Sequence, residues 1–214
     1  MQSMKVGVLG SGDVGKVLAG GFVSIGHEVK IGSRQPAKLA EWVRGAGKRA
    51  SAGSFEDAAR DGDIIVLATL GSGAENAIRL AGVKNFAGKV VIDATNPLEF
   101  STGVPRLYVG HTDSLGEQVQ RWLPDARVVK AFNTVGNAHM IKPKFPGGPP
   151  DMFICGNDDD AKRLVSQICE QFGWGVIDIG GIDGSRHLEP MCMVWVLHGF
   201  RVKSWNHAFK MLHK

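Results

Sequence analysis

Residues 6–15 read Val-Gly-Val-Leu-Gly-Ser-Gly-Asp-Val-Gly, a short apolar run that breaks into a glycine-rich turn before a segment with helical spacing. In such a pattern Gly10 permits the sharp turn from strand to helix, and Gly12 lets a pyrophosphate approach the backbone. Gly15 lets the helix pack closely on the strand, and the amino terminus of the helix faces the anion. The stretch predicts a dinucleotide site. The alternative is a glycine-rich turn without a ligand.

The next apolar run, residues 28–32, ends in Ser33 and Arg34, and Lys38 follows about one helical turn later. A chain that binds the ribose of NAD normally carries Asp or Glu at this place. A hydroxyl, a guanidinium and an ammonium can instead converge on one phosphate. Ser33, Arg34 and Lys38 therefore predict a site for the 2′-phosphate of NADP(H), with NAD(H) as the second choice. The alternative is that both cations simply begin a solvated helix.

Apolar, β-branched runs recur along the chain, and segments with helical spacing separate most of them. The expected strands are residues 5–9, 29–32, 64–68, 90–93, 128–131, 152–155 and 176–179. The expected helices are residues 14–24, 36–44, 54–61, 74–80, 114–123, 160–172 and 185–200, several of which begin at a capping residue such as Ser54 or Ser114. This alternation predicts an α/β, Rossmann-like, doubly wound fold, with a mostly parallel sheet, helices on both faces and a small C-terminal helical part.

We expect one NADP-binding domain over residues 1–214, with a nucleotide-binding core at 1–135. Residues 136–214 then form a C-terminal extension on the substrate side, where an apolar helical stripe predicts a homodimer contact.

Composition excludes several classes of function. The 214 residues carry a net charge of +4 and are 43% hydrophobic, which is ordinary for a globular protein. Lys and Arg are scattered without interleaved aromatic residues, so no nucleic-acid partner is expected. Three cysteines without a Cys-x-x-Cys pair predict neither disulfides nor a metal site. We expect no signal peptide, and the longest apolar stretch is too short to span a membrane. A cytoplasmic location is the expectation.

Small or polar residues follow several predicted strands. Ala68 and Thr69 end one of them, and Ala131 and Asn133 end another. Ligands of open α/β sheets bind at the carboxyl ends of the strands. We therefore expect these four residues to border the nicotinamide half of the coenzyme.

Asp93 ends a further apolar run, and Lys130 lies at the end of the same run as Ala131. Asp93 and Lys130 either border the nicotinamide or form a buried pair that holds the strand ends together. Two loops rich in Pro and Gly, residues 96–113 and 141–151, follow strands in the same way. Each loop either covers the reacting ring or is a surface connection.

Reduction of a ketone requires a proton donor near the carbonyl oxygen. Tyr108 is followed four residues later by Thr112, so the Tyr-x-x-x-Lys pair of short-chain dehydrogenases is absent. His111, His139 and Lys142 are candidate acids, although an ordinary surface position is the favoured interpretation of each. A flavin or deazaflavin ring takes its proton from solvent and mainly needs stacked rings and excluded water. The lack of an obvious acid favours a ring acceptor and leaves the catalytic residues unassigned.

Six motifs together resemble the coenzyme F420 (deazaflavin)-dependent NADP oxidoreductases and the soluble NADPH-binding domain of six-transmembrane ferric reductases. The motifs are Gly10-Ser-Gly-Asp-Val-Gly15, Gly32-Ser-Arg34 with Lys38, Asp93-Ala-Thr-Asn-Pro97, Val129-Lys-Ala-Phe-Asn-Thr134, Cys155-Gly-Asn-Asp-Asp-Asp160 and Arg186-His-Leu-Glu-Pro190. The resemblance implies a doubly wound nucleotide domain, commonly dimeric, that passes a hydride between NADP(H) and a flavin-like ring.

The same resemblance implies which residues contact the coenzyme. Ser11, Gly12, Asp13, Val14, Ser33, Arg34 and Lys38 resemble its NADP-binding positions, and Ala68, Thr69 and Asn133 resemble those that line the nicotinamide. Archaeal deazaflavin enzymes have histidine at the position of Asn133, which makes this chain more similar to the ferric reductase domain there. Coenzyme F420, FMN and FAD are therefore all candidate acceptors. The alternatives are an NADP(H)-binding redox sensor without turnover and an imine or carbonyl reductase.

Overall fold

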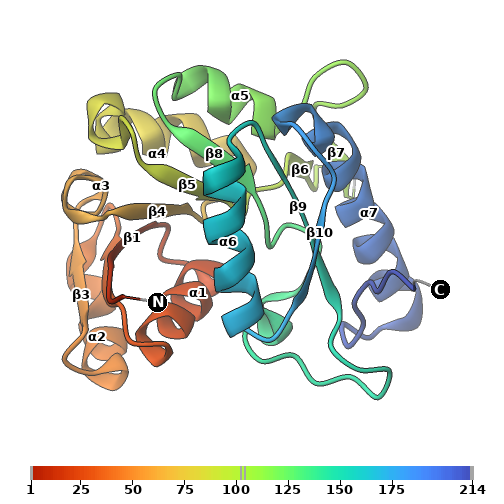
Figure 1. The fold of residues 1–214 in the computed structure, drawn as a ribbon, viewed down its shortest axis with the longest axis horizontal. Helices are drawn as coiled ribbons and strands as arrows, with labels where there is room; N and C mark the ends of the chain where they lie inside the picture. The colour runs from red at the N-terminus through yellow and green to blue at the C-terminus, as the bar shows by residue number, and fades with distance from the viewer. Residues whose placement is uncertain (1, 102, 104, 213–214) are drawn as a thin grey trace.

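The central sheet has eight strands in the computed structural model, which describes residues 2–101, 103 and 105–212 (Figure 1). In chain order they are β1 (Lys5–Leu9), β2 (Glu28–Gly32), β3 (Ala50–Gly53), β4 (Ile64–Leu67), β5 (Val90–Asp93), β8 (Arg127–Lys130), β9 (Asp151–Gly156) and β10 (Gly175–Asp178). Their order across the sheet is β10-β9-β8-β5-β4-β1-β2-β3. Neighbouring strands are parallel except β8 and β9, which are antiparallel. The predicted mostly parallel α/β sheet is confirmed.

Helices cover both faces of the sheet because successive side chains of a strand point to opposite sides. Val66 of β4 belongs to the core beneath α1 (Asp13–Ser24), α2 (Ala40–Ala46) and α6 (Asp159–Gln171). Its neighbour Leu67 belongs to the core beneath α3 (Phe55–Asp61), α4 (Ala74–Ala81) and α5 (Leu115–Trp122). Both faces of the strands are therefore apolar, as expected of a buried parallel sheet.

The last helix, α7 (Ser185–Val202), lies at the end of the molecule opposite β3 (Figure 1). Its Leu188 packs on Phe153 and Cys155 of β9. The chain then returns to β9, where the backbone N–H of Asp151 donates to the carbonyl of Phe209 at 2.9 Å. The long C-terminal helix thus packs onto the sheet rather than standing apart.

Some local predictions differ from the structure. Strand β3 was not expected, since its sequence Ala-Ser-Ala-Gly lacks large apolar residues. The expected helix at 36–44 begins as a 3-10 turn, Pro36–Leu39, before α2. Loop 96–113 contains a two-stranded ribbon of β6 (Leu98–Glu99) and β7 (Arg106–Leu107).

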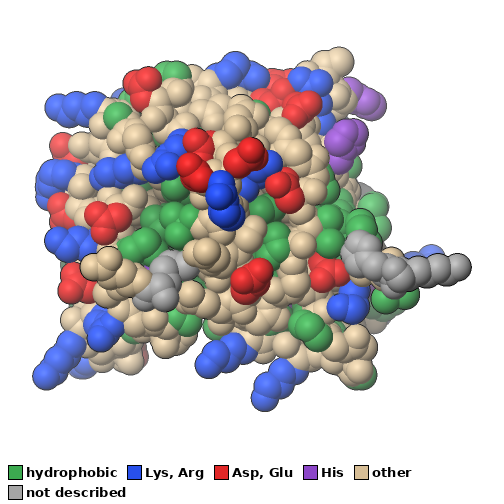
Figure 2. Space-filling model, in the orientation of Figure 1, with side chains coloured by type: hydrophobic (Ala, Val, Ile, Leu, Met, Phe, Trp, Pro, Cys, Tyr) green, Lys and Arg blue, Asp and Glu red, His purple; other side chains and the backbone are tan. Residues whose placement is uncertain are grey.

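Charged side chains are spread over the visible face, where Lys and Arg are mixed with Asp and Glu (Figure 2). Within the described ranges, we find no helix whose length and apolar character would let it cross a membrane.

Candidate functional site

A cleft of about 1080 Å³ opens at the carboxyl edge of the sheet. Gly10 after β1, Ser33 after β2, Ala68 after β4 and Ala94 after β5 all line it. The chain passes from β1 outward through β2 and β3, and in the opposite direction through β4, β5 and β8. The cleft therefore lies where the winding of the sheet reverses, the usual ligand site of open α/β sheets.

Two positions in the turn after β1, residues 10 and 15, accept only glycine. Gly10 has a φ of 130°, and a Cβ on it would lie 2.3 Å from the carbonyl oxygen of Ala68. A Cβ on Gly15 would lie 2.0 Å from the carbonyl oxygen of Gly10. The first glycine thus permits the turn and the third permits close packing of α1, as the sequence predicts.

The start of α1 is open toward a ligand. A Cβ built on Gly12 meets no described atom within 4 Å, although this residue lines the cleft with Asp13 and Val14. Gly12 is also the N-cap of α1, and no side chain of the described residues caps the helix. The first amides of α1 are therefore available to an anion, so this turn fits a pyrophosphate.

The predicted phosphate-binding side chains lie on the same cleft. Ser33 is buried, and its Oγ lies 3.2 Å from Oγ of Ser11 and accepts a hydrogen bond from the backbone N–H of Gln35 at 3.1 Å. Arg34 and Lys38 are exposed and line the cleft. Neither cation forms an ion pair with a carboxylate in the described part of the chain. Both are available to a phosphate.

The opposite wall of the cleft is formed by residues that follow β4 and β5. Ala68, Thr69, Leu70 and Ala94 line it. Oγ1 of Thr69 is buried and has no hydrogen-bond partner among the described residues. The side chain of Leu70 is 80% exposed, although it is apolar. This wall offers one unsatisfied polar atom and one uncovered apolar surface.

Ala131 and Asn133 are buried and do not line the cleft, and Asn133 is only 2% exposed. The amide nitrogen of Asn133 donates to Oδ1 of Asn96 at 3.1 Å and to the carbonyl of Leu188 at 2.9 Å. Oδ1 of Asn133 has no described partner. Contact of these two residues with the nicotinamide therefore stays a prediction.

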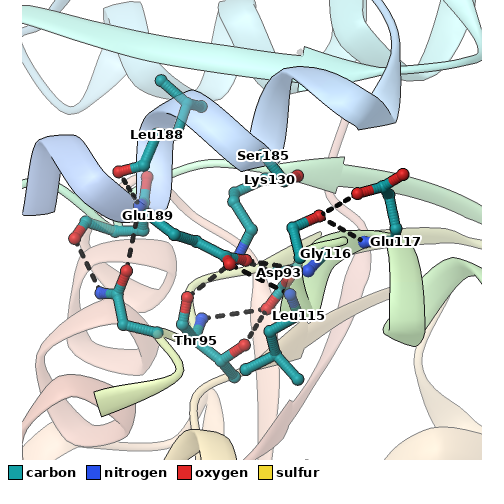
Figure 3. Close-up of polar contacts among 12 residues, drawn as sticks. Asp93, Thr95, Leu115, Gly116, Glu117, Lys130, Ser185, Leu188 and Glu189 are labelled. Carbon is teal, nitrogen blue, oxygen red and sulfur yellow. Dashed lines mark hydrogen bonds and ion pairs between the residues drawn. The ribbon is translucent and has the colours of Figure 1, made fainter. Parts of the chain in front are cut away.

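Asp93 and Lys130 form the buried pair that the sequence allowed, and Glu189 of α7 joins them (Figure 3). Nζ of Lys130 lies 2.9 Å from Oδ2 of Asp93 and 3.1 Å from Oε1 of Glu189. Burial alone would lower the pKa of Lys130, but the two carboxylates raise it above its ordinary value. Burial also raises the pKa of Glu189, while Lys130 opposes that shift.

Sequence reasoning missed Glu189. The available signal is its place in α7, since Leu188, Cys192 and Val196 on the same side of the helix are buried and apolar. A carboxylate within such a stripe requires a buried partner.

The candidate acids lie elsewhere, since neither His111, His139 nor Lys142 lines the cleft in the described structure. Nε2 of His139 lies 3.1 Å from Oδ1 of Asn206. Tyr108 also lies outside the lining, and burial together with the charge of Glu189 raises its pKa. The described residues of both proline-rich loops, 96–113 and 141–151, also lie outside the lining of the cleft.

The cysteines offer no reactive thiolate. All three are buried and unpaired. Burial raises the pKa of Cys155 to about 11 and that of Cys192 to about 12. Both thiols therefore stay protonated at neutral pH.

Comparison with known families gives a match over residues 5–97 to the family described as NADP oxidoreductase coenzyme F420-dependent. The F420-dependent NADP reductase of Methanothermobacter marburgensis is 32% identical over 209 residues, which cover 88% of this chain and 89% of that protein. A solved structure from Arthrobacter sp. FB24, described as a candidate F420-dependent NADP-reductase, is 38% identical with a TM-score of 0.94. The alignment covers 99% of this chain and 100% of that one.

A second kind of relative is longer. Metalloreductase STEAP3 of Rattus norvegicus is 30% identical over 190 residues, which are 89% of this chain. The chain spans only 36% of the length of that metalloreductase.

Proposed function

Because this chain belongs to the family of coenzyme F420-dependent NADP oxidoreductases, we propose that it transfers a hydride between NADP(H) and a flavin or deazaflavin ring. The observation that carries the proposal is that Arg34 and Lys38, which form no ion pair with any described carboxylate, line the same cleft as the glycine turn. A ligand that needs both features carries a pyrophosphate and a further phosphate. NADP(H) has this chemistry and NAD(H) does not.

The chain's own residues hold the coenzyme at two places. The turn from Gly10 through Ser11 to Gly12, with the first amides of α1, binds the pyrophosphate. Ser33, Arg34 and Lys38 bind the 2′-phosphate, for which the guanidinium provides two parallel donors.

The wall after β4 binds the reacting half. Bound NADPH supplies the hydride. Ala68 and Thr69 give the ring small side chains to lie against, and Leu70 adds an apolar face on which a planar acceptor can pack. No Tyr or His of the described residues lines the cleft, which supports an acceptor that needs positioning and excluded water rather than a protein acid.

The test mixes the protein with NADPH and, in separate reactions, oxidised F420, FMN and FAD. We expect oxidation of NADPH with at least one acceptor, and a loss of most of this activity in Arg34→Ala. Arg44→Ala is the matched control, because Arg44 is exposed on α2 and does not line the cleft. Equal activity in Arg34→Ala and the wild type would overturn the proposal. Tight NADPH binding with no acceptor reduced would favour the redox-sensor alternative.

We also propose that two copies pair through α7, on which Val194 and Leu197 are exposed and apolar. Exposed apolar side chains on one helix face are typical of an interface. Light scattering of the wild type and of a Val194→Asp variant tests this, with a dimer expected only for the wild type. A wild-type monomer would contradict it.

A further inference from the structure

A closed ring of polar contacts surrounds Lys130 (Figure 3). Besides its contacts to Asp93 and Glu189, Nζ of Lys130 donates to the carbonyl of Thr95 at 2.9 Å. Oδ1 of Asp93 accepts from the backbone N–H of Thr95 at 2.9 Å and from its hydroxyl at 2.6 Å. The end of β5 is thereby bonded to the end of β8 by side chains as well as by the sheet.

The ring closes through two asparagines. The side-chain amide of Asn96, the residue after Thr95, donates to the carbonyl of Asn133 at 2.8 Å. The amide of Asn133 donates back to Asn96 and also to the carbonyl of Leu188. Leu188 precedes Glu189, whose carboxylate contacts Lys130. The circuit thus passes through the ends of β5 and β8 and through α7.

A fourth element joins the ring at Glu189. Its carboxylate accepts from the backbone N–H of Leu115 at 3.0 Å and of Gly116 at 2.9 Å, at the start of α5. A Cβ on Gly116 would lie 2.8 Å from Cε of Lys130 and 2.2 Å from Oγ of Ser185. The lysine stem therefore fits only because residue 116 is glycine.

The ring adjoins the cleft directly. Ala94 lies between the ring members Asp93 and Thr95 and lines the cleft. The carbonyl of Asn96 lies 2.2 Å from the place that a Cβ on Gly71 would occupy, so the loop after β4 packs tightly on the loop after β5. A shift of the ring therefore moves the wall on which we place the nicotinamide.

Stability alone does not explain three buried charges. Apolar residues of similar volume stabilise a core as well or better, because each buried charge loses its hydration. A buried ionic network instead restricts which arrangement of the surrounding backbone is allowed. The contacts here restrict the segment from Asp93 to Asn96 with respect to β8 and α7.

We propose that this ring is a positioning device for hydride transfer, and that Thr95 and Lys130 are positioning residues within it. The inference rests on the proposed function. The ring holds Ala94 and the segment after β8 so that the cleft wall presents one fixed surface to the nicotinamide. Misplacement of reacting groups by about 1 Å can reduce a rate by about a hundredfold.

The test compares Thr95→Val, which removes the hydroxyl bonded to Asp93, with Thr95→Ser, which keeps it. Neither variant adds or removes a charge. Ser54→Ala is the stability control, because it removes the cap of α3 away from the ring. We measure turnover, the dissociation constant of NADPH, and the fluorescence anisotropy of the bound nicotinamide, which needs no acceptor.

We expect turnover to fall at least about tenfold in Thr95→Val with an NADPH dissociation constant within about twofold of the wild type. Anisotropy of the bound nicotinamide should also fall, and Thr95→Ser should restore both readouts. Ser54→Ala should change neither. If Thr95→Val does not fold, Asn96→Ala opens the ring on its other side without exposing a buried charge and carries the same expectation.

Unchanged turnover and anisotropy in a folded variant would overturn the ring's role and leave the proposed function intact. A wild type that binds no NADPH would overturn both. A wild type that binds NADPH but reduces no acceptor would overturn the proposed function, and the anisotropy comparison would still decide whether the ring fixes the bound nicotinamide.

Discussion

The chain places its cations in two opposite settings. Arg34 and Lys38, beyond β2, are exposed on the cleft and have no carboxylate partner among the described residues. Lys130, at the end of β8, is 0% exposed and lies between two carboxylates. Both settings are at the carboxyl edge of the same sheet. A cation without a carboxylate partner is available to bind a ligand, whereas a cation between two carboxylates stabilises the arrangement of the protein's own segments.

This difference also separates what each region contributes. The β2 end supplies free charge, so its residues should affect binding and hardly affect stability. The Lys130 ring supplies fixed geometry, so its residues should affect stability and turnover and hardly affect coenzyme affinity.

The largest effect is expected from Lys130→Met. The substitution leaves Asp93 and Glu189 buried without their cation, which costs about 3–5 kcal/mol of unfolding free energy. Urea unfolding followed by circular dichroism measures this. Lys38→Met is the control and should stay within about 0.5 kcal/mol of the wild type. A loss below about 1 kcal/mol in Lys130→Met would show that the buried charges are replaceable.

The next effect concerns coenzyme choice. Arg34→Ala removes the charge-assisted contact with the 2′-phosphate, worth about 1.5–3 kcal/mol in total, so the dissociation constant of NADPH should rise about 10- to 150-fold. The dissociation constant of NADH should not change. Fluorescence titration of both coenzymes, with Arg44→Ala as control, measures this. An equal loss for both coenzymes would mean that Arg34 does not distinguish them.

A smaller effect is expected at Leu70. Leu70→Ser removes apolar surface from the cleft wall, which should raise the KM of the ring acceptor severalfold, equivalent to about 1 kcal/mol. The dissociation constant of NADPH should stay the same. Leu80→Ser changes a 44% exposed leucine on α4 and should leave the KM unchanged. An equal rise of the KM in both variants would mean that Leu70 does not contact the acceptor.

The smallest effect comes from a surface pair. Hydrogen bonds from Arg121 lower the pKa of Asp113 from 3.8 to about 2. A carboxyl group whose folded-state pKa is lowered stabilises the fold above its ordinary pKa, and this stability is lost as the pH falls toward the lowered value. Asp113→Asn should therefore be slightly less stable than the wild type at pH 6, with the difference vanishing near pH 2. Unfolding curves at both pH values measure this. If Asp113→Asn is still less stable than the wild type near pH 2, the loss of stability does not come from the ionised carboxylate of Asp113.

The sequence predicts those parts of the fold that local chemistry decides. The Gly-x-Gly-x-x-Gly turn, the alternation of apolar runs and the caps at Ser54 and Ser114 are local signals, and the structure confirms each. The cations at the end of β2 follow from the same local reasoning, since their place depends only on where one strand ends.

The parts that depend on distant contacts were not predictable. The partner of Lys130 across the fold, Glu189, is 59 residues away in the chain, and only packing of α7 brings the two together. Strand β3 forms from Ala-Ser-Ala-Gly because β2 offers it an edge, not because these residues favour strands. Whether Asp93 and Lys130 face a ligand or each other was likewise open until the fold placed α7 behind them.

The most direct test of the account is a calorimetric titration of the wild-type protein with NADPH and with NADH at the same ionic strength. Free cations at the end of β2 predict that NADPH binds at least about tenfold more tightly, which corresponds to about 1.4 kcal/mol. Equal affinity for the two coenzymes would contradict the assignment of Arg34 and Lys38 to the 2′-phosphate.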